Sequence, residues 1–350
     1  GPWANDARPR GIERRSVPFP AAGGRGRAYV FHPRGRPSGT YLVLPGLHFL
    51  GPDDPRFDKF ARSLAASGLL VVAPFIGAFT RLRLDASMFA DAEAALDLAE
   101  RLSAEHGLGA PAVFSISFGS TLAFHLGARR KPRALVVFGG FHDFVRTVRF
   151  AVTGTTVHRG RALACARDPL NAPVVFLNLL EELALDEGGD GDGRDQLAAA
   201  WLEMVHRTWG KMELKRAGAR DPIAHAIARS LPCELRTAFL RGCTLEDGAL
   251  AWLEPALERG QASLGFVDPA ASIRAIRCPV VLVHGRDDDV IPYTESVELF
   301  DALPPEARGA LHLTGAFGHT GAASLGLAAG AAEAKTMLAM VRDLASAPHD

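Results

Sequence analysis

Ser117 lies where the chain passes from an expected strand into an expected helix, and its hydroxyl is the first candidate for chemistry. Residues 112–127 read A-V-F-S-I-S-F-G-S-T-L-A-F-H-L-G, in which an apolar run ends directly before this serine. A serine at such a turn projects above the edge of a sheet and can attack a carbonyl carbon. Because the turn is tight, the residues two before and two after must be small, and Ser115 and Gly119 are. The spacing S-x-S-x-G, where G-x-S-x-G is usual, is therefore compatible with a nucleophilic serine at this turn.

The same serine also fits a structural role. Ser117 could be an ordinary helix N-cap, whose side chain accepts a backbone N–H in the first turn. Ser115 and Ser120 are rival hydroxyls in the same segment. Taken alone, the motif supports the catalytic and the structural interpretation about equally, so the choice depends on the rest of the chain.

An acid and a base follow the serine in the order that a nucleophilic mechanism requires. A serine hydroxyl needs a base to take its proton and an acid to orient that base. Residues 281–292 read V-L-V-H-G-R-D-D-D-V-I-P and place an acid-rich turn after an expected strand. Residues 313–321 read L-T-G-A-F-G-H-T-G and place His319 in a glycine-flanked loop after the last expected strand. Among the twelve histidines, His319 alone has this context and order.

With these motifs in place, the sequence resembles the α/β-hydrolase superfamily over residues 30–140 and 275–345. The resemblance implies Ser117 as nucleophile and His319 as base. In the family pattern H-G-x-x-D-x-x-V-P the acid aligns with Asp288, and Asp287 is the alternative if the turn is shifted. It also implies capped serine-hydrolase chemistry of the carboxylesterase type.

The loop after the expected strand at 41–44 is the candidate for half of an oxyanion hole. Such a hole needs two backbone N–H groups directed at the developing negative oxygen. The loop at 44–51 reads L-P-G-L-H-F-L-G, and the resemblance makes Leu47 one donor and Phe118, after the nucleophile, the other. Gly46 supplies the permissive backbone that the loop requires.

The order of the expected elements defines the fold class and the domains. Strands and helices alternate over 26–141 and again over 276–350, which predicts an α/β core with a mostly parallel sheet and helices on both faces. Residues 142–275 show mainly helical spacing and predict a large helical cap, inserted after the sixth strand. Residues 1–25 are rich in Pro, Arg and Gly and predict an irregular segment with one edge strand near 13–18.

The cap supplies candidate substrate contacts. His48 of the oxyanion loop, together with Phe141, His142 and Phe144 after the sixth strand, is expected to face the substrate. Other apolar residues of the cap could line the pocket or form the cap's own core, namely Phe150, Phe176, Leu179, Trp201 and Trp209. Residues 51–68 and 139–154 also resemble a bacterial group of α/β hydrolases, which brings no substrate with it.

The composition of the chain limits the kinds of ligand and partner that we expect. The chain has 39 basic and 39 acidic residues, so the basic footprint of a nucleic-acid-binding protein is absent. No run of about 18 apolar residues predicts a membrane span. The four cysteines show no metal-ligand spacing with the histidines, and no metal or organic cofactor is expected. We expect a cytoplasmic protein that acts on a small molecule, alone or as a homodimer; export after loss of a signal peptide is the alternative.

These observations predict hydrolysis of a carboxylic ester or thioester of a small or medium substrate through an acyl-enzyme on Ser117. An amidase, an acyltransferase or a C–C bond hydrolase would use the same triad, because the fold does not separate these reactions. A catalytically silent ligand-binding protein on the same fold is the alternative from another class.

Overall fold

The computed structural model describes residues 9–185, 191–315 and 327–349. The chain divides into two compact units. One comprises Gly1–Asp143 and Val267–Asp350, and the other comprises Phe144–Phe266. Within the described residues, no helix is both long enough and apolar enough to cross a membrane.

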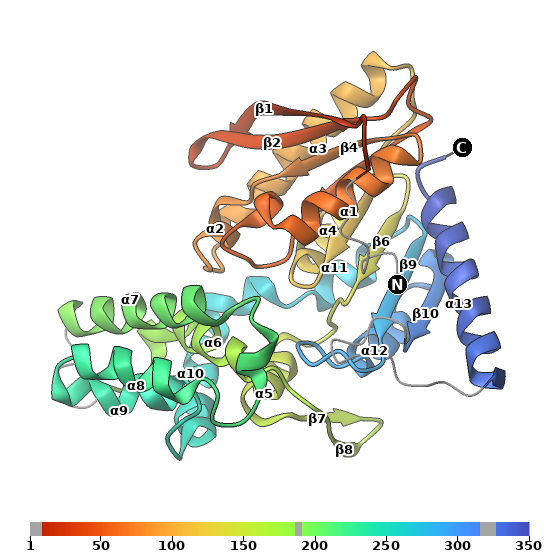
Figure 1. Cartoon of the computed structure of the whole chain (residues 1–350). Coiled ribbons are helices and arrows are strands. Elements are labelled where there is room, and N and C mark those ends of the chain that lie inside the picture. Colours follow the sequence, from red (N-terminus) through yellow and green to blue (C-terminus); the bar gives the residue numbers. More distant parts are fainter. Residues whose placement is uncertain (1–8, 186–190, 316–326, 350) are drawn as a thin grey trace. The chain divides into compact units, whose positions relative to one another are not determined.

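The first unit is built on an eight-stranded sheet with the strand order β1-β2-β4-β3-β5-β6-β9-β10 (Figure 1). The first two pairings are antiparallel, and all pairings from β4 to β10 are parallel. Strands β3, β4 and β9 are buried along their whole length, as expected for apolar runs covered on both faces. The strands are β1 (Glu13–Ala21), β2 (Gly24–His32), β3 (Gly39–Leu44), β4 (Leu69–Pro74), β5 (Ala112–Ile116), β6 (Leu135–Phe138), β9 (Val280–Gly285) and β10 (Arg308–Thr314).

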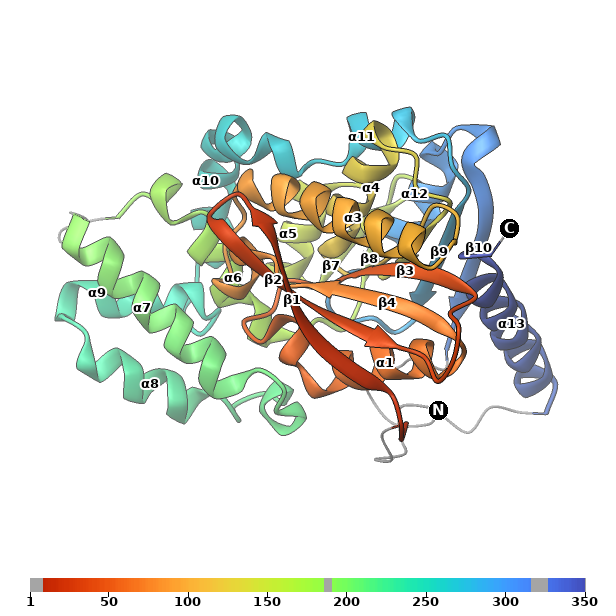
Figure 2. The ribbon, with the colours of Figure 1, turned by 90° about the horizontal axis from the view of Figure 1, so that it is seen from above.

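Helices cover both faces of this sheet, as the sequence predicted. Figure 2 shows α3 and α4 on one face and α1 and α13 on the other. Helix α1 begins after Asp54, whose side chain accepts the backbone N–H of Arg56, and it ends before Gly68, which has a φ of +97°. The helices of this unit are α1 (Pro55–Ala66), α2 (Gly77–Thr80), α3 (Ser87–Glu105), α4 (Gly119–Arg129), α11 (Ala270–Ala275), α12 (Thr294–Ala302) and α13 (Leu327–Ser346), with 3₁₀ turns η1 (Gly51–Asp53) and η6 (Pro305–Ala307).

The N-terminal segment is more regular than the sequence predicted. Residues 1–25 were expected to be irregular apart from an edge strand near 13–18, whereas β1 extends to Ala21 and β2 already begins at Gly24. All nine residues of β1 pair with β2. The strand lies at the sheet edge and is mostly exposed, so it lacks the apolar pattern that reveals a buried strand. Its prolines are compatible with that edge position.

The second unit is the helical insertion that the sequence predicted after the sixth strand, drawn in green to cyan in Figure 1. It spans Phe144–Phe266, whereas the sequence placed it at 142–275. A short antiparallel hairpin, β7 with β8, was not predicted. The elements are α5 (Phe144–Thr153), β7 (Thr155–His158), β8 (Arg161–Ala164), η2 (Pro169–Asn171), α6 (Ala172–Asn178), η3 (Leu180–Glu182), α7 (Gly191–Thr208), η4 (Met212–Lys215), α8 (Asp221–Ser230), α9 (Cys233–Gly242) and α10 (Ala249–Leu264), followed by η5 (Gly265–Val267).

Candidate active site

Ser117 occupies a strained turn between β5 and α4. Its φ is +51°, in the left-handed region that an L-residue enters at a cost of about 1–2 kcal/mol. Its backbone N–H donates to the carbonyl of Phe138 at 2.8 Å, which fixes the turn against the end of β6. Strain of this kind persists only where the surroundings enforce it, and it concentrates at functional sites. An ordinary helix N-cap has extended backbone geometry, so the turn favours the nucleophile over the structural interpretation.

The neighbouring small residues are required by packing. A Cβ atom on Gly119 would lie 2.5 Å from the carbonyl oxygen of Pro45, so no larger residue fits there without a shift of the backbone. Ser115 and Ser120 are fully buried, whereas Ser117 is only partly buried. Of the three serine hydroxyls in the segment, that of Ser117 is therefore the accessible one.

The expected oxyanion loop packs directly against this turn. A Cβ atom on Gly46 would lie 3.4 Å from the Cβ of Ser117 and 3.3 Å from the carbonyl oxygen of Ile116. Leu47 follows Gly46, so its backbone lies beside the nucleophile. Phe118 follows Ser117 in the chain, at the start of α4, and its ring packs on Phe141 with centroids 5.1 Å apart. The structure thus brings both expected donors next to Ser117, and their role as donors stays a prediction.

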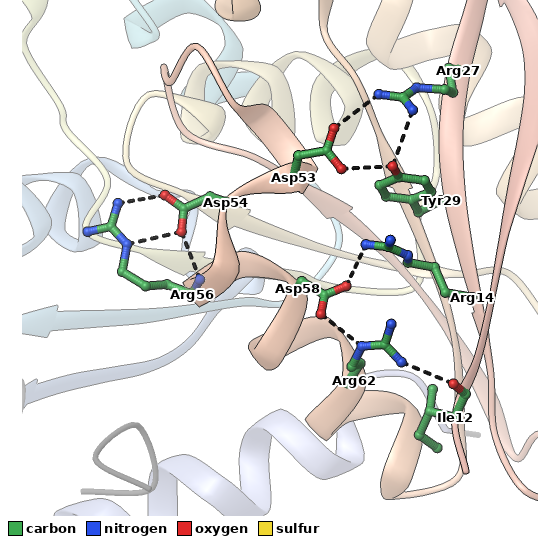
Figure 3. Close-up of polar contacts among 9 residues, drawn as sticks. All are labelled: Ile12, Arg14, Arg27, Tyr29, Asp53, Asp54, Arg56, Asp58 and Arg62. Carbon is green, nitrogen blue, oxygen red and sulfur yellow. Dashed lines mark hydrogen bonds and ion pairs between the residues drawn. The ribbon is translucent and has the colours of Figure 1, made fainter. Parts of the chain in front are cut away.

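Polar contacts hold the far end of this loop against β1 and β2 (Figure 3). Asp53 accepts hydrogen bonds from the Tyr29 hydroxyl at 2.7 Å and from Arg27 at 3.2 Å. Asp58, nearly buried, pairs at 2.8 Å with both Arg14 and Arg62. The segment after the loop is therefore tied to the sheet, which limits how far the loop can move.

His48 is part of the loop's own hydrogen bonding. Its Nδ1 accepts the backbone N–H of Leu50 at 3.1 Å, its Nε2 lies 3.5 Å from Asp54 Oδ2, and its ring stacks on Phe49. Burial raises the pKa of Asp54, but the hydrogen bond and charge of Arg56 outweigh this and keep the pKa below its usual value. A structural role accounts for these contacts, and a substrate contact by His48 stays a prediction.

The three carboxylates of the acid-rich turn after β9 differ in solvent exposure and in hydrogen bonding. Asp287 is exposed, and Asp289 is buried. Asp288 is held by the turn itself, since its Oδ1 accepts the backbone N–H groups of Val290 at 2.8 Å and Ile291 at 3.0 Å. Asp288 therefore has a fixed orientation that an exposed Asp287 lacks.

His284, the first residue of the H-G-x-x-D-x-x-V-P pattern, lies close to the candidate acid, a contact that was not predicted from the sequence. It is fully buried, with Nδ1 2.6 Å from Ser296 Oγ and Nε2 2.8 Å from the carbonyl of Ile291. Its Nε2 also lies 3.5 Å from Asp288 Oδ2. Burial raises the pKa of Asp288, but the hydrogen bond and charge of His284, together with the two backbone N–H groups, hold that pKa below its usual value. The carboxylate form of Asp288 is thus favoured.

Strand β6 links the nucleophile turn to the acid turn. The carbonyl of Phe138, its last residue, accepts the Ser117 N–H, and a Cβ on the next residue, Gly139, would lie 3.5 Å from Asp288 Oδ2. Gly139 has a φ of +65°, which glycine adopts without strain. Ser117 and Asp288 therefore flank the same strand end. His319, the expected base, lies outside the described residues.

A buried carboxylate fixes the segment that follows β6. Glu295 of α12 is fully buried, and its Oε2 accepts the backbone N–H groups of His142 at 3.0 Å and Asp143 at 2.9 Å. This contact was not predicted, because nothing in the local sequence links positions so far apart. Phe141 is fully buried, so packing positions Phe141 and Glu295 positions the backbone of His142.

The apolar candidates of the insert belong largely to its own core. Phe150, Phe176 and Trp201 are fully buried, and Phe144 and Leu179 nearly so. Trp209 donates its Nε1–H to the carbonyl of Leu170. These positions fit the structural alternative, and pocket lining by them stays a prediction. In the described part of the chain, no group of three or more His, Cys, Asp or Glu side chains could hold a metal ion.

Comparison with known proteins adds structural relatives. No protein-family profile matches the chain, and no curated protein matches its sequence significantly. A puromycin hydrolase, solved as a serine-to-alanine mutant with bound PGG, matches with a TM-score of 0.52 at 13% identity, over 96% of this chain and 39% of the hydrolase. The uncomplexed acylaminoacyl peptidase of Pyrococcus horikoshii matches with a TM-score of 0.50 at 10% identity, over 97% and 42%. This chain spans about two-fifths of the length of both proteins.

The chain has the α/β-hydrolase fold. This confirms the fold class predicted from the sequence, including the mostly parallel sheet, the helices on both faces and the large helical insertion after β6. Within the α/β-hydrolase fold, catalytic groups belong at the carboxyl ends of the parallel strands. Ser117 follows β5 and Asp288 follows β9, so both lie at that edge.

Proposed function

We propose that the protein is a serine hydrolase that cleaves a carboxylic ester or thioester of a small or medium substrate through an acyl-enzyme on Ser117. The observation that carries the proposal is the backbone of Ser117, with φ at +51° in a turn that packs on the Gly46 loop. Such a turn exposes a hydroxyl beside backbone N–H groups, which is the arrangement that acyl transfer needs.

The proposed mechanism assigns one step to each group. His319 takes the proton from Ser117 Oγ as the oxygen attacks the acyl carbon, and the carbonyl oxygen becomes negative. The N–H groups of Leu47 and Phe118 stabilise that oxygen, while Asp288 orients the imidazole and stabilises its protonated form. His319 then gives the proton to the leaving alcohol or thiol. Water, deprotonated by His319, hydrolyses the acyl-enzyme and restores Ser117.

Amide hydrolysis, acyl transfer and C–C bond hydrolysis would use the same groups. Two of the structural relatives are a peptidase and a puromycin hydrolase, which keeps amide substrates among those to be assayed. A catalytically silent ligand-binding protein is the alternative from another class. It predicts a serine that does not react.

A fluorophosphonate probe tests the proposal, because it labels only an activated serine. We expect labelling of the full chain and its loss in Ser117→Ala, with kcat on p-nitrophenyl acyl esters reduced about 10⁶-fold. Ser120→Ala is the matched control, since it removes a buried hydroxyl three residues away and should leave both unchanged. A folded wild-type protein that is not labelled would favour the silent alternative. Esters of graded acyl length would then define the substrate range.

A further inference from the structure

Two arginines of the insert converge on one hydroxyl. Arg167, just after β8, donates from Nη2 to Thr244 Oγ1 at 3.2 Å. Arg220, just before α8, donates from Nη2 to the same oxygen at 3.3 Å. Arg167 also donates to the carbonyl of Ala151 at 3.2 Å, and Arg220 reaches the carbonyl of Cys243 at 3.5 Å. The two guanidinium groups therefore lie side by side within the Phe144–Phe266 unit.

The positive charge of this pair is not balanced within the described residues. Neither guanidinium forms an ion pair there, although Arg220 is only 7% exposed. Asp168, next to Arg167, instead pairs with Lys215 at 2.9 Å and accepts the backbone N–H of Leu170. Burial lowers the pKa of Arg167, and the charge of Arg220 lowers it further against the opposing effect of Asp168. Arginine stays protonated in proteins, so two adjacent positive charges remain.

The pair also offers hydrogen-bond donors without an acceptor. The Nε–H of Arg220 is buried and has no partner among the described residues. A threonine hydroxyl has two lone pairs and one O–H, and both lone pairs of Thr244 Oγ1 receive arginine N–H groups. Its O–H is therefore left to donate. Thr244 has a φ of +54°, an outlier for a β-branched residue, so its placement is enforced by the surroundings.

We propose that Arg167, Arg220 and Thr244 form a binding site for a phosphate group. Three residues supply donors around one point, which suits a tetrahedral oxyanion with several oxygens better than a carboxylate with two. Arg167 is only partly buried, so an anion can reach the cluster from its exposed side. The phosphate can be inorganic or the monoester group of a small molecule, since both present the same oxygens. This site is independent of the chemistry proposed for Ser117.

Titration calorimetry of the full chain in a buffer without multivalent anions tests the site. Inorganic phosphate and glycerol 3-phosphate are the probes, and acetate is the comparison. We expect saturable binding of phosphate, weaker binding of acetate, and loss of at least about tenfold in phosphate affinity in Arg167→Gln, because a charged hydrogen bond is removed. Tighter binding of glycerol 3-phosphate than of phosphate would identify an organic monoester as the ligand.

Two further variants keep the test decisive. Arg149→Gln removes the same charge from an arginine of the same unit that pairs with Glu254 at 2.7–2.8 Å, and it should bind phosphate like the wild type. Thr244→Gly removes the hydroxyl at a φ that glycine tolerates, so binding should weaken while the thermal midpoint is retained. No saturable phosphate binding by the folded wild type, or equal losses in Arg149→Gln and Arg167→Gln, would overturn the proposal.

Discussion

Asp288 at the sheet edge and Arg220 in the insert are both charged groups with little solvent exposure, but their surroundings differ. Asp288 accepts two backbone N–H groups and lies 3.5 Å from His284, so its charge faces donors on several sides. Arg220 reaches one hydroxyl and one carbonyl, and its Nε–H has no partner in the described part of the chain. The charge of Asp288 is compensated by the fold, whereas that of Arg220 is not compensated by the residues that the structure describes.

The two surroundings suit different roles. Dipoles that are fixed before a reaction need no rearrangement when charge develops, so a compensated Asp288 suits the role of orienting a catalytic base. An uncompensated cation is unfavourable until an anion arrives, so Arg220 suits ligand binding. Three measurements test whether Asp288 and Arg220 differ in this way.

Replacement of Asp288 should have its largest effect on catalysis. Asp288→Asn keeps the size of the side chain but removes the charge that orients and stabilises the imidazolium of His319. We expect kcat on a p-nitrophenyl ester to fall about 10⁴-fold. Asp287→Asn, at an exposed neighbouring position, should change it by no more than about twofold. Equal losses in the two variants would show that the turn was aligned wrongly.

Much of the sheet edge could be predicted from the sequence, because local patterns determine it. The apolar run before Ser117, the small residue at Gly119 and the acids after β9 each lie within a few residues of the element that positions them. The S-x-S-x-G motif has two physical reasons. The backbone at Ser117 is strained, and a Cβ atom at Gly119 would lie only 2.5 Å from the carbonyl oxygen of Pro45. The edge strand β1 was underestimated because an exposed strand carries no apolar period.

The contacts that complete both regions could not be predicted, because they join distant parts of the chain. Glu295 accepts N–H groups from residues 152 and 153 positions away. Arg167 and Thr244 are 77 positions apart, and each of these residues alone is unremarkable in the sequence. Only tertiary packing brings such partners together. Neither an apolar pattern nor a glycine motif marks these residues in the sequence, so their contacts could not be predicted from it.

A smaller effect, on stability, compares the two charges directly. Asp288→Leu leaves the Val290 and Ile291 N–H groups without their acceptor and removes the carboxylate 3.5 Å from His284, so we expect a loss of about 3–5 kcal/mol in the free energy of unfolding. Arg220→Met replaces this charge by an unbranched apolar chain and should change that energy by less than about 1 kcal/mol in phosphate-free buffer. Urea unfolding followed by circular dichroism measures both. A larger loss in Arg220→Met than in Asp288→Leu would reverse the comparison.

The smallest expected effect concerns pH. The pKa of Asp288 is lower in the folded protein than its usual value near 3.9, so the unfolded chain binds its proton more tightly. Its contribution to stability is therefore complete above about pH 5 and is lost as pH falls through the unfolded pKa toward the folded one. Between pH 6 and pH 3, Asp288→Asn should lose less unfolding free energy than the wild type. Part of the pH dependence of stability should remain in this variant, because the pKa values of Asp54 and Asp343 are also lowered. Arg220→Met should follow the wild-type profile, because an arginine does not titrate in this range. An equally steep loss in Asp288→Asn and the wild type would mean that the donors around Asp288 do not favour its charged form.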